Sequence, residues 1–317
     1  MSFSADTHQI NKLTLSVLKD ETAQTEITVL PDYGAALHAF TLPVNDGQFN
    51  IIDNYSSADE IRKEMALSFK GAKLSPFPCR INQATYHFQG QKYEFKNKFL
   101  DGSAIHGLLY NKPFRVTDTF SNEEEAGIIL AYDYNQDDEG YPFRYTCTVE
   151  YRLQRHHLLT VSTTVINKTH IAIPIADGWH PYFRLDNDVS DWFMQFPSES
   201  IVEFDDDLIP TGKLASYDTF SSSKRIDEIQ LDNCFVLKKE SKTPVCSIVN
   251  PKNKLRLDFF ADKSYPFLQI YIPPHRKSIA IENLSAAPDC FNNKMGLILL
   301  EPGHSQTFTV QYQPGLA

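Results

Sequence analysis

The chain lacks the cysteine patterns of disulfide-rich and zinc-binding proteins. Its 317 residues contain five cysteines, at positions 79, 147, 234, 246 and 290, and no two of them form a Cys-x-x-Cys pair. An odd number at irregular spacing excludes a disulfide framework and a zinc ribbon. We therefore expect five reduced cysteines in the core.

The chain also lacks a long apolar run and an excess of positive charge. No window approaches the roughly 18 consecutive apolar residues of a membrane span, and residues 1–6 do not begin a secretory signal. The formal net charge is −10, whereas surfaces that bind nucleic acid or anionic lipid are basic. These absences predict a cytoplasmic protein with neither a nucleic-acid nor a membrane partner.

Several common catalytic motifs are missing as well. The sequence has no Gly-x-Ser-x-Gly elbow, no Gly-x-Gly-x-x-Gly fingerprint, no P-loop and no His-Glu-x-x-His. This excludes the usual α/β-hydrolase, dinucleotide-binding, nucleotide-binding and metalloprotease classes. The acidic run Asp205-Asp206-Asp207 is typical of a solvated turn rather than a metal site. We expect neither a metal nor a cofactor.

What the sequence does have is alternation of apolar and polar residues. From Tyr145 to Leu153 every second side chain is apolar, and residues 159–165 continue the pattern after a short polar break. Alternation of this kind predicts two half-buried strands that pair as a hairpin. Similar segments occur at 13–17, 255–259, 268–272 and 308–312. Strands are therefore predicted along the whole chain.

One segment alone has a helical pattern. Ser57 and Glu60 have the spacing of a capping box, and apolar residues recur every four positions up to Phe69. No linker rich in Pro, Gly or Ser divides the chain, and no repeat is evident. With so little helix to cover crossovers, the sheets must be antiparallel. We predict an all-β protein, a large antiparallel β-sandwich with one or few short helices, in a single domain over 1–317.

The hexapeptide 178–183, Gly-Trp-His-Pro-Tyr-Phe, places one histidine among bulky rings. Such a histidine is more often a satisfied core residue than a catalyst. However, Pro181 cannot donate to a sheet ladder, which predicts that the strand ends there and presents His180 at the sheet rim. Trp179 is left open between stacking on a sugar and packing in the core.

The other candidates are weak when each is taken alone. Glu282 alternates with Ile279 and Ile281, so it should point away from the core and be solvated, unless that sheet face is concave and covered. His106 precedes a glycine that permits close approach. Arg80, Asp232 and Gln269 have equally ordinary explanations as surface, turn and strand residues.

In chain order, however, these segments resemble the aldose 1-epimerase (galactose mutarotase) family over nearly the whole chain. The resemblance rests on the following segments: Arg80-Ile81, Tyr86-His87-Phe88, Ile105-His106-Gly107, Gly140-Tyr141-Pro142, His180-Pro181-Tyr182-Phe183, Leu231-Asp232, Leu268-Gln269-Ile270-Tyr271, Ile281-Glu282 with Pro288-Asp289, and Leu300-Glu301-Pro302-Gly303.

The resemblance implies a supersandwich fold and an isomerase that interconverts the anomers of a free aldohexose, such as galactose or glucose, without a cofactor. It assigns His180 as the general acid and Glu282 as the general base. It assigns sugar binding to Arg80, His106, Asp232 and Gln269. The expected partner is a monosaccharide, and the expected state is a monomer or homodimer.

The chain departs from the family pattern at a few positions. Cys79, Leu108 and Asn283-Leu284 stand where the family commonly has Asn, Gly and Thr-Gln. We expect these positions to lie beside the sugar and so to bear on substrate identity rather than on the type of reaction.

Three alternatives remain open. The first is a catalytically silent sugar-binding or sensing protein on the same fold. The second is a hexose-phosphate mutarotase, for which Lys73 and Arg184 are the nearby cations. The third is a double-stranded β-helix enzyme with an iron held by His106, His180 and Glu282, although the close His-x-His spacing of such sites is absent.

Overall fold

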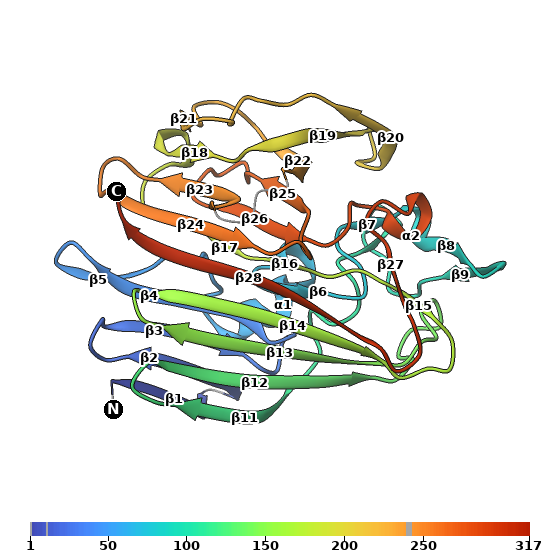
Figure 1. Ribbon diagram of the computed structural model, residues 1–317, viewed down its shortest axis with the longest axis horizontal. Helices are drawn as coiled ribbons and strands as arrows, with labels where there is room; N and C mark the ends of the chain where they lie inside the picture. The colour runs from blue at the N-terminus through green and yellow to red at the C-terminus, as the bar shows by residue number, and fades with distance from the viewer. Residues whose placement is uncertain (1, 11, 239–242) are drawn as a thin grey trace.

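The computed structural model describes residues 2–10, 12–238 and 243–317. Antiparallel strands dominate it, and its three larger sheets form two packed layers (Figure 1). The prediction of an all-β sandwich with few helices is confirmed. No helix in these ranges is long and apolar enough to cross a membrane.

One layer is a nine-stranded sheet, drawn at the front in Figure 1. The predicted hairpin forms its centre, with every residue from Tyr145 to Gln154 paired to a partner between Asn167 and Leu158. In spatial order the strands are β11 (Arg115–Ser121), β12 (Glu125–Tyr134), β13 (Tyr145–Gln154), β14 (Leu158–Asn167), β28 (Ser305–Leu316), β24 (Leu255–Ala261), β23 (Cys246–Val249), β18 (Phe193–Gln195) and β21 (Lys224–Arg225).

The other layer consists of two sheets joined by a bridge between Ile52 and Phe183. The five-stranded sheet contains β1 (Phe3–Ile10), β2 (Leu13–Asp20), β3 (Thr25–Leu30), β4 (Ala36–Val44) and β5 (Gly47–Asn50). The eight-stranded sheet contains, in spatial order, β20 (Pro210–Ala215), β19 (Ser198–Phe204), β22 (Asp232–Leu237), β25 (Phe267–Tyr271), β26 (Ile279–Leu284), β16 (Gly178–His180) and β6 (Ala72–Leu74), and β17 (Tyr182–Phe183) also pairs with β26.

Small elements complete the fold. Three two-stranded sheets pair β7 (Arg80–Ile81) with β10 (Ala104–Ile105), β8 (Thr85–Phe88) with β9 (Gln91–Glu94), and β15 (Ile173–Ile175) with β27 (Ile298–Leu300). Two α-helices, α1 (Ala58–Ser68) and α2 (Cys290–Asn293), and two 3-10 helices, η1 (Asn82–Ala84) and η2 (Val189–Asp191), complete the described ranges. The prediction of one or few short helices is confirmed, although the sequence located only α1, because α2 spans too few residues to show a periodic pattern.

Helix α1 lies where the capping box predicted it. The Ser57 hydroxyl accepts a hydrogen bond from Glu60 N at 3.1 Å, and the Glu60 carboxylate accepts one from Ser56 N at 2.7 Å. The helix ends at Phe69, which has a left-handed backbone with φ of 51°. The two ends of α1 are thus determined by local hydrogen bonds and backbone geometry.

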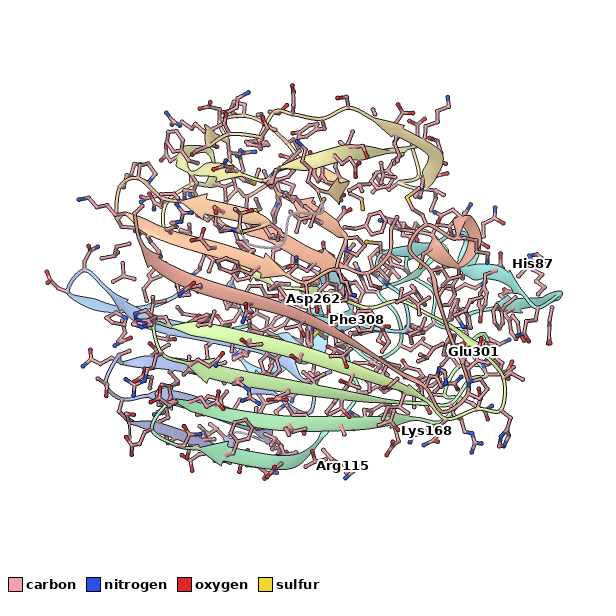
Figure 2. All side chains as sticks on the ribbon, viewed as in Figure 1. His87, Arg115, Lys168, Asp262, Glu301 and Phe308 are labelled. Carbon is pink, nitrogen blue, oxygen red and sulfur yellow. The ribbon has the colours of Figure 1, made fainter. Side chains whose placement is uncertain are left out.

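The core fills the space between the layers. Tyr151 of the nine-stranded sheet packs edge-on against Trp179 of the eight-stranded sheet, with ring centroids 5.9 Å apart, and Phe183 packs against Tyr312 at 5.4 Å. All five cysteines are buried and unpaired, as expected. Figure 2 shows the contrast between buried Phe308 and charged residues at the rim of the sandwich. Apolar burial on this scale is the main source of stability for the fold.

Candidate active site

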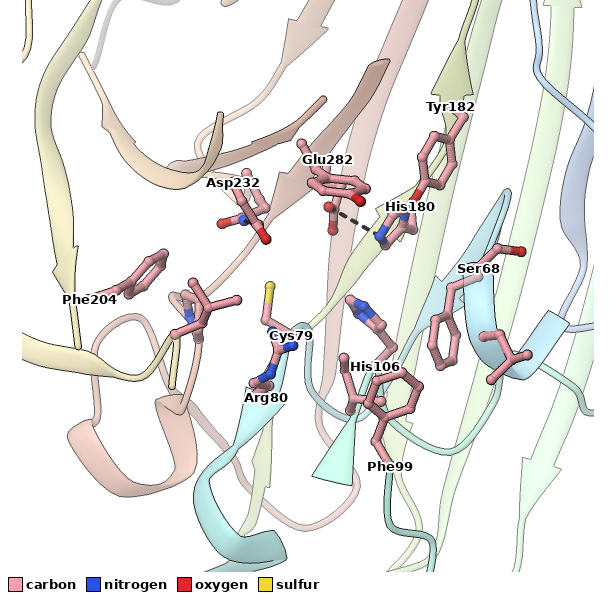
Figure 3. A pocket seen from close by; sticks show the side chains of 17 residues that line it. Ser68, Cys79, Arg80, Phe99, His106, His180, Tyr182, Phe204, Asp232 and Glu282 are labelled. Atoms are coloured by element: carbon pink, nitrogen blue, oxygen red, sulfur yellow. Dashed lines mark hydrogen bonds and ion pairs between the residues drawn. The ribbon is translucent and has the colours of Figure 1, made fainter. Parts of the chain in front are cut away.

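A pocket opens on the face of the eight-stranded sheet that is turned away from the sandwich core. It encloses about 780 Å³, counted to its open mouth, and all six predicted site residues line it (Figure 3). Walls come from the end of α1 and from loops next to the sheet. The lining residues are Leu67, Ser68, Phe69, Cys79, Arg80, Phe99, Ile105, His106, His180, Tyr182, Phe204, Leu208, Asp232, Gln269, Tyr271, Glu282 and Pro288.

Strand register brings the two proposed proton-transfer groups together. Gly178 pairs with Leu284 and Tyr182 pairs with Ala280, so His180, midway between them, lies across from Glu282. Pro181 interrupts the ladder between β16 and β17, as expected from its missing N–H. The result is a direct contact between His180 Nε2 and Glu282 Oε1 at 3.3 Å.

Glu282 is not solvated, because the exception that the sequence left open, a concave and covered sheet face, is the case that applies. Its side chain is only 2% exposed, because the sheet face on which it lies is covered by α1, by the loop that carries Phe99 and by the end of β19 at Phe204. Alternation along β26 correctly places Glu282 opposite Ile281, but both faces of this strand are buried. The carboxyl therefore lies at the bottom of a concave surface.

Burial changes the proton affinities of this pair. It lowers the pKa of His180 to about 4, and together with the nearby Asp232 it raises the pKa of Glu282 well above its ordinary value. Burial disfavours the charged form of each group, which explains the opposite directions. The two shifts favour the neutral forms of both groups, an imidazole and a carboxylic acid.

His106 is held by a strained segment of backbone. It has φ of 56°, and the next residue, Gly107, has φ of 73° and forms a bridge with Ser75. The ring packs on Phe69 at 4.6 Å and edge-on against His180 at 4.9 Å. Burial, reinforced by His180 and Arg80, lowers the pKa of His106 well below its usual value. His106 is therefore a neutral donor and acceptor beside the pair.

Substitution of Gly107 by Ala should destabilise the protein by about 2 to 5 kcal/mol. A methyl group there would lie 2.2 Å from the Ser75 carbonyl oxygen, so about 1 to 3 kcal/mol of overlap adds to about 1 to 2 kcal/mol for an L-residue at positive φ. Gly90→Ala is the matched control, because its φ is 79° but open space surrounds the added carbon. Equal losses in urea unfolding would contradict the steric argument.

Arg80 is the one residue with a permanent positive charge among those that line the pocket. Its Nε donates to Asp101 Oδ2 at 2.9 Å. The backbone of β7 is fixed from the other side, since Arg80 O accepts from Asp289 N at 2.7 Å and the Asp289 carboxylate accepts from Asn82 N at 3.0 Å. The Pro288-Asp289 segment thus positions the arginine.

Asp232 and Gln269 form the polar side of the pocket. Gln269 Nε2 donates to Asp232 Oδ1 at 2.9 Å, and Gln269 lies directly across the ladder from Glu282. Burial raises the pKa of Asp232. Four buried polar atoms of the site lack a hydrogen-bond partner within the described residues: His106 Nδ1, His180 Nδ1, Gln269 Oε1 and Glu282 Oε2. Unsatisfied buried groups of this kind are suited to the hydroxyls of a ligand.

The aromatic wall was only partly foreseen. Tyr182 stacks on the His180 ring at 4.9 Å and so helps to hold it in place. Trp179 proves to be a core residue outside the pocket lining, which answers the question left open by the sequence. Phe69, Phe99 and Phe204 were not predicted as site residues, since they lie in no recognisable motif.

The departures from the family pattern lie mostly away from the site. Leu108, Asn283 and Leu284 are buried and do not line the pocket, so the expectation that they lie beside the sugar was wrong. Cys79 does line it, with φ of 52°. Asparagine tolerates such a backbone better than cysteine.

Lys73 and Arg184, the two cations considered for a sugar phosphate, do not face the pocket. Lys73 is fully buried and pairs with Asp177 at 2.5 Å, and Arg184 donates to Asn50 O at 2.9 Å. Neither lines the site. Over the described ranges no group of three or more His, Cys, Asp and Glu side chains is arranged to hold a metal ion.

Comparison with known proteins agrees with this architecture. The sequence profile of the aldose 1-epimerase family matches residues 17–313, and the chain belongs to that family. It is 29% identical over 249 residues to the uncharacterized protein YihR of Escherichia coli K12, covering 76% of this chain and 78% of that one. It is 24% identical over 324 residues to an aldose 1-epimerase of Streptococcus thermophilus, covering 88% of both.

A solved structure extends the comparison to the fold. A galactose mutarotase-like protein from Clostridium acetobutylicum superposes with a TM-score of 0.88 at 16% identity, covering 100% of this chain and 99% of that one. At this identity the similarity establishes the fold rather than the substrate. Family membership implies an isomerase that acts on a sugar.

Proposed function

We propose that this chain is an aldose 1-epimerase that interconverts the α and β anomers of a free aldohexose such as galactose or glucose. The observation that carries the proposal is the buried contact of 3.3 Å between His180 and Glu282 inside a pocket of polar and aromatic residues. Anomer exchange needs an acid and a base beside one carbon. We further propose that residues 1–317 act as one cytoplasmic domain, as a monomer or homodimer.

The reaction needs one proton on the pair. Transfer of the Glu282 proton to His180 across their contact yields a carboxylate and an imidazolium. The carboxylate removes the proton of the C1 hydroxyl, the C1 to ring-oxygen bond breaks, and the imidazolium protonates the ring oxygen. Rotation about C1–C2 exposes the other face of the aldehyde, and the same steps in reverse close the ring. The pair ends with the proton that it began with, so no cofactor is consumed.

The remaining polar residues bind the sugar in this proposal. Arg80 and His106 donate to sugar oxygens, and the Arg80 charge stabilises the negative charge that develops during ring opening. The carboxylate of Asp232, which already accepts from Gln269, accepts from ring hydroxyls. Phe69 and Phe99 supply apolar surface for the C–H faces of the ring.

The pH profile of kcat/KM should be bell-shaped with its acid limb near pH 4 rather than near 6.5. Below about pH 4 both groups are protonated and no base remains, because burial lowers the pKa of His180 to that value. Above the raised pKa of Glu282 the pair has lost its proton and no acid remains. Polarimetry across pH tests this, and an acid limb at pH 6 to 7 would show that His180 is not desolvated in the working enzyme.

A panel of aldoses followed by polarimetry and NMR exchange is the direct test of the proposed activity. We expect the approach to anomeric equilibrium to accelerate for at least one hexose. The second candidate, a silent sugar-binding protein, predicts binding by calorimetry with no acceleration for any sugar. The buried acid–base pair favours the enzyme, since a binding site has no need of a desolvated carboxyl.

A further inference from the structure

Beside the acid–base pair, a second row of side chains crosses the same face of the eight-stranded sheet. Tyr182 of β17 and Tyr271 of β25 are both paired with Ala280 of β26, which lies between them. Ala280 precedes Glu282 by two positions, so the two residues point to the same sheet face. Both tyrosines line the pocket. The row therefore places two tyrosine side chains next to the carboxyl of Glu282.

The two tyrosines are held in fixed positions. The small side chain of Ala280 leaves room above it, and the rings of Tyr182 and Tyr271 meet there edge-on, with centroids 6.4 Å apart. The Tyr182 ring also stacks on His180, beside which it lies in Figure 3. Rings packed in this way lose little further freedom when a ligand binds.

The hydroxyl groups of this row are available to a ligand. Neither hydroxyl has a hydrogen-bond partner among the described residues, although Tyr182 is 6% exposed. Burial raises the pKa of Tyr182, and Glu282 adds to that shift. Burial and the nearby Asp232 raise the pKa of Tyr271. Both groups therefore stay protonated at neutral pH, and a protonated phenol donates a hydrogen bond.

We propose that the hydroxyls of Tyr182 and Tyr271 are catalytic donors that hold the oxygen on C1 while the sugar ring is open. This inference rests on the proposed function, in which Glu282 takes the proton of the C1 hydroxyl. The oxygen that loses this proton lies at Glu282, and the two tyrosines are the neighbours of Glu282 in the adjoining row.

Anomer exchange needs such donors because the C1 oxygen moves. Rotation about C1–C2 carries the aldehyde oxygen from one side of the ring to the other, and a single carboxyl on a rigid strand does not follow it. Two hydroxyls beside that carboxyl offer hydrogen bonds in more than one position. They also stabilise the negative charge that builds on this oxygen as its proton leaves. The tyrosines keep their own protons throughout, so the proton balance of the acid–base pair is unchanged.

Substitution by phenylalanine tests the hydroxyls alone, because it keeps both rings and the stack on His180. We expect kcat to fall about tenfold for Tyr182→Phe and for Tyr271→Phe, and about 10²-fold for the double variant. KM should change less than about threefold, since the charge on the oxygen develops only during ring opening. Tyr110→Phe is the matched control, because Tyr110 is buried against Phe69 and does not line the pocket. Native kcat in the double variant, or a change in KM alone, would overturn the proposal.

Calorimetry separates this inference from the proposed function. The 1,5-lactam of gluconic or galactonic acid has a carbonyl oxygen on C1, whereas the matching 1,5-anhydro sugar has no oxygen there. The double variant should bind the lactam about tenfold more weakly and the anhydro sugar less than twofold more weakly. Equal weakening for both ligands would reject the hydroxyl pair, as would native protein that binds the lactam no more tightly than the anhydro sugar. If no hexose is accelerated but the lactam alone binds more weakly, the proposed function fails and the pair stands as the binding site of the C1 oxygen.

Discussion

Replacement of Glu282 by Gln should lower kcat for anomer exchange about 10³-fold, within the roughly 10² to 10⁴ that a positioned proton-transfer group contributes. The amide keeps the shape of a protonated carboxyl, but it can neither accept the C1 proton nor supply one to His180. KM should change little, since the sugar-binding residues are untouched. Saturation kinetics by coupled polarimetry would measure both parameters.

Glu282→Gln should lower kcat without lowering the stability of the protein. A stability measurement therefore serves as the control for correct folding. The raised pKa of Glu282 contributes stability at low pH that the native protein loses as the pH rises through that pKa. Glu282→Gln removes this loss, so the variant should be as stable as the native protein at pH 5 and more stable at alkaline pH. A stable variant with native kcat would exclude Glu282 as the base.

Replacement of Lys73 by Met should destabilise the protein by about 3 to 5 kcal/mol. Lys73 and Asp177 are both fully buried, with Nζ and Oδ1 2.5 Å apart, and Nζ also donates to Gly178 O at 3.1 Å. Burial already raises the pKa of Asp177, and Lys73 opposes that shift. Without the lysine the carboxylate has no counter-charge in the interior. Urea unfolding at pH 7 would measure the loss.

A double substitution separates the charge from the packing. Lys73→Met with Asp177→Asn removes both charges, and the asparagine Oδ1 can still accept from Tyr265 Oη, which lies 2.6 Å from the Asp177 carboxylate. We expect this variant to regain most of the lost stability, because a neutral pair pays no ionic desolvation cost. A double variant as unstable as Lys73→Met would show that the contacts of the lysine chain, rather than its charge, matter.

Local signals in the sequence account for much of the fold. The capping residues of α1, the alternation of β13 and β14 and the break at Pro181 act within a few residues of the chain. Each signal depends on backbone hydrogen bonds or on the alternation of side chains along a strand, and both are determined by residues close together in the chain. For the same reason, the short α2 helix had no detectable signal.

The six residues of the candidate site are recognisable as a set from the amino-acid sequence, although the sequence does not give their geometry. Each of the six residues had an ordinary explanation by itself, and their order along the chain made the set recognisable. Phe99, on a loop, and Phe204, at the end of β19, had no such signal, because it is the packing of distant parts of the chain that brings them to the pocket.

The amino-acid order by itself determined that this protein is built of antiparallel strands, where its longer helix lies, and which residue types were available for acid–base chemistry. Tertiary structure alone decided that Glu282 is buried rather than solvated and that Trp179 packs in the core. The physical reason is desolvation. Whether a carboxyl is an ordinary surface charge or a proton carrier depends on what covers its sheet face, and here the cover comes from α1 and from loops far from Glu282 in sequence.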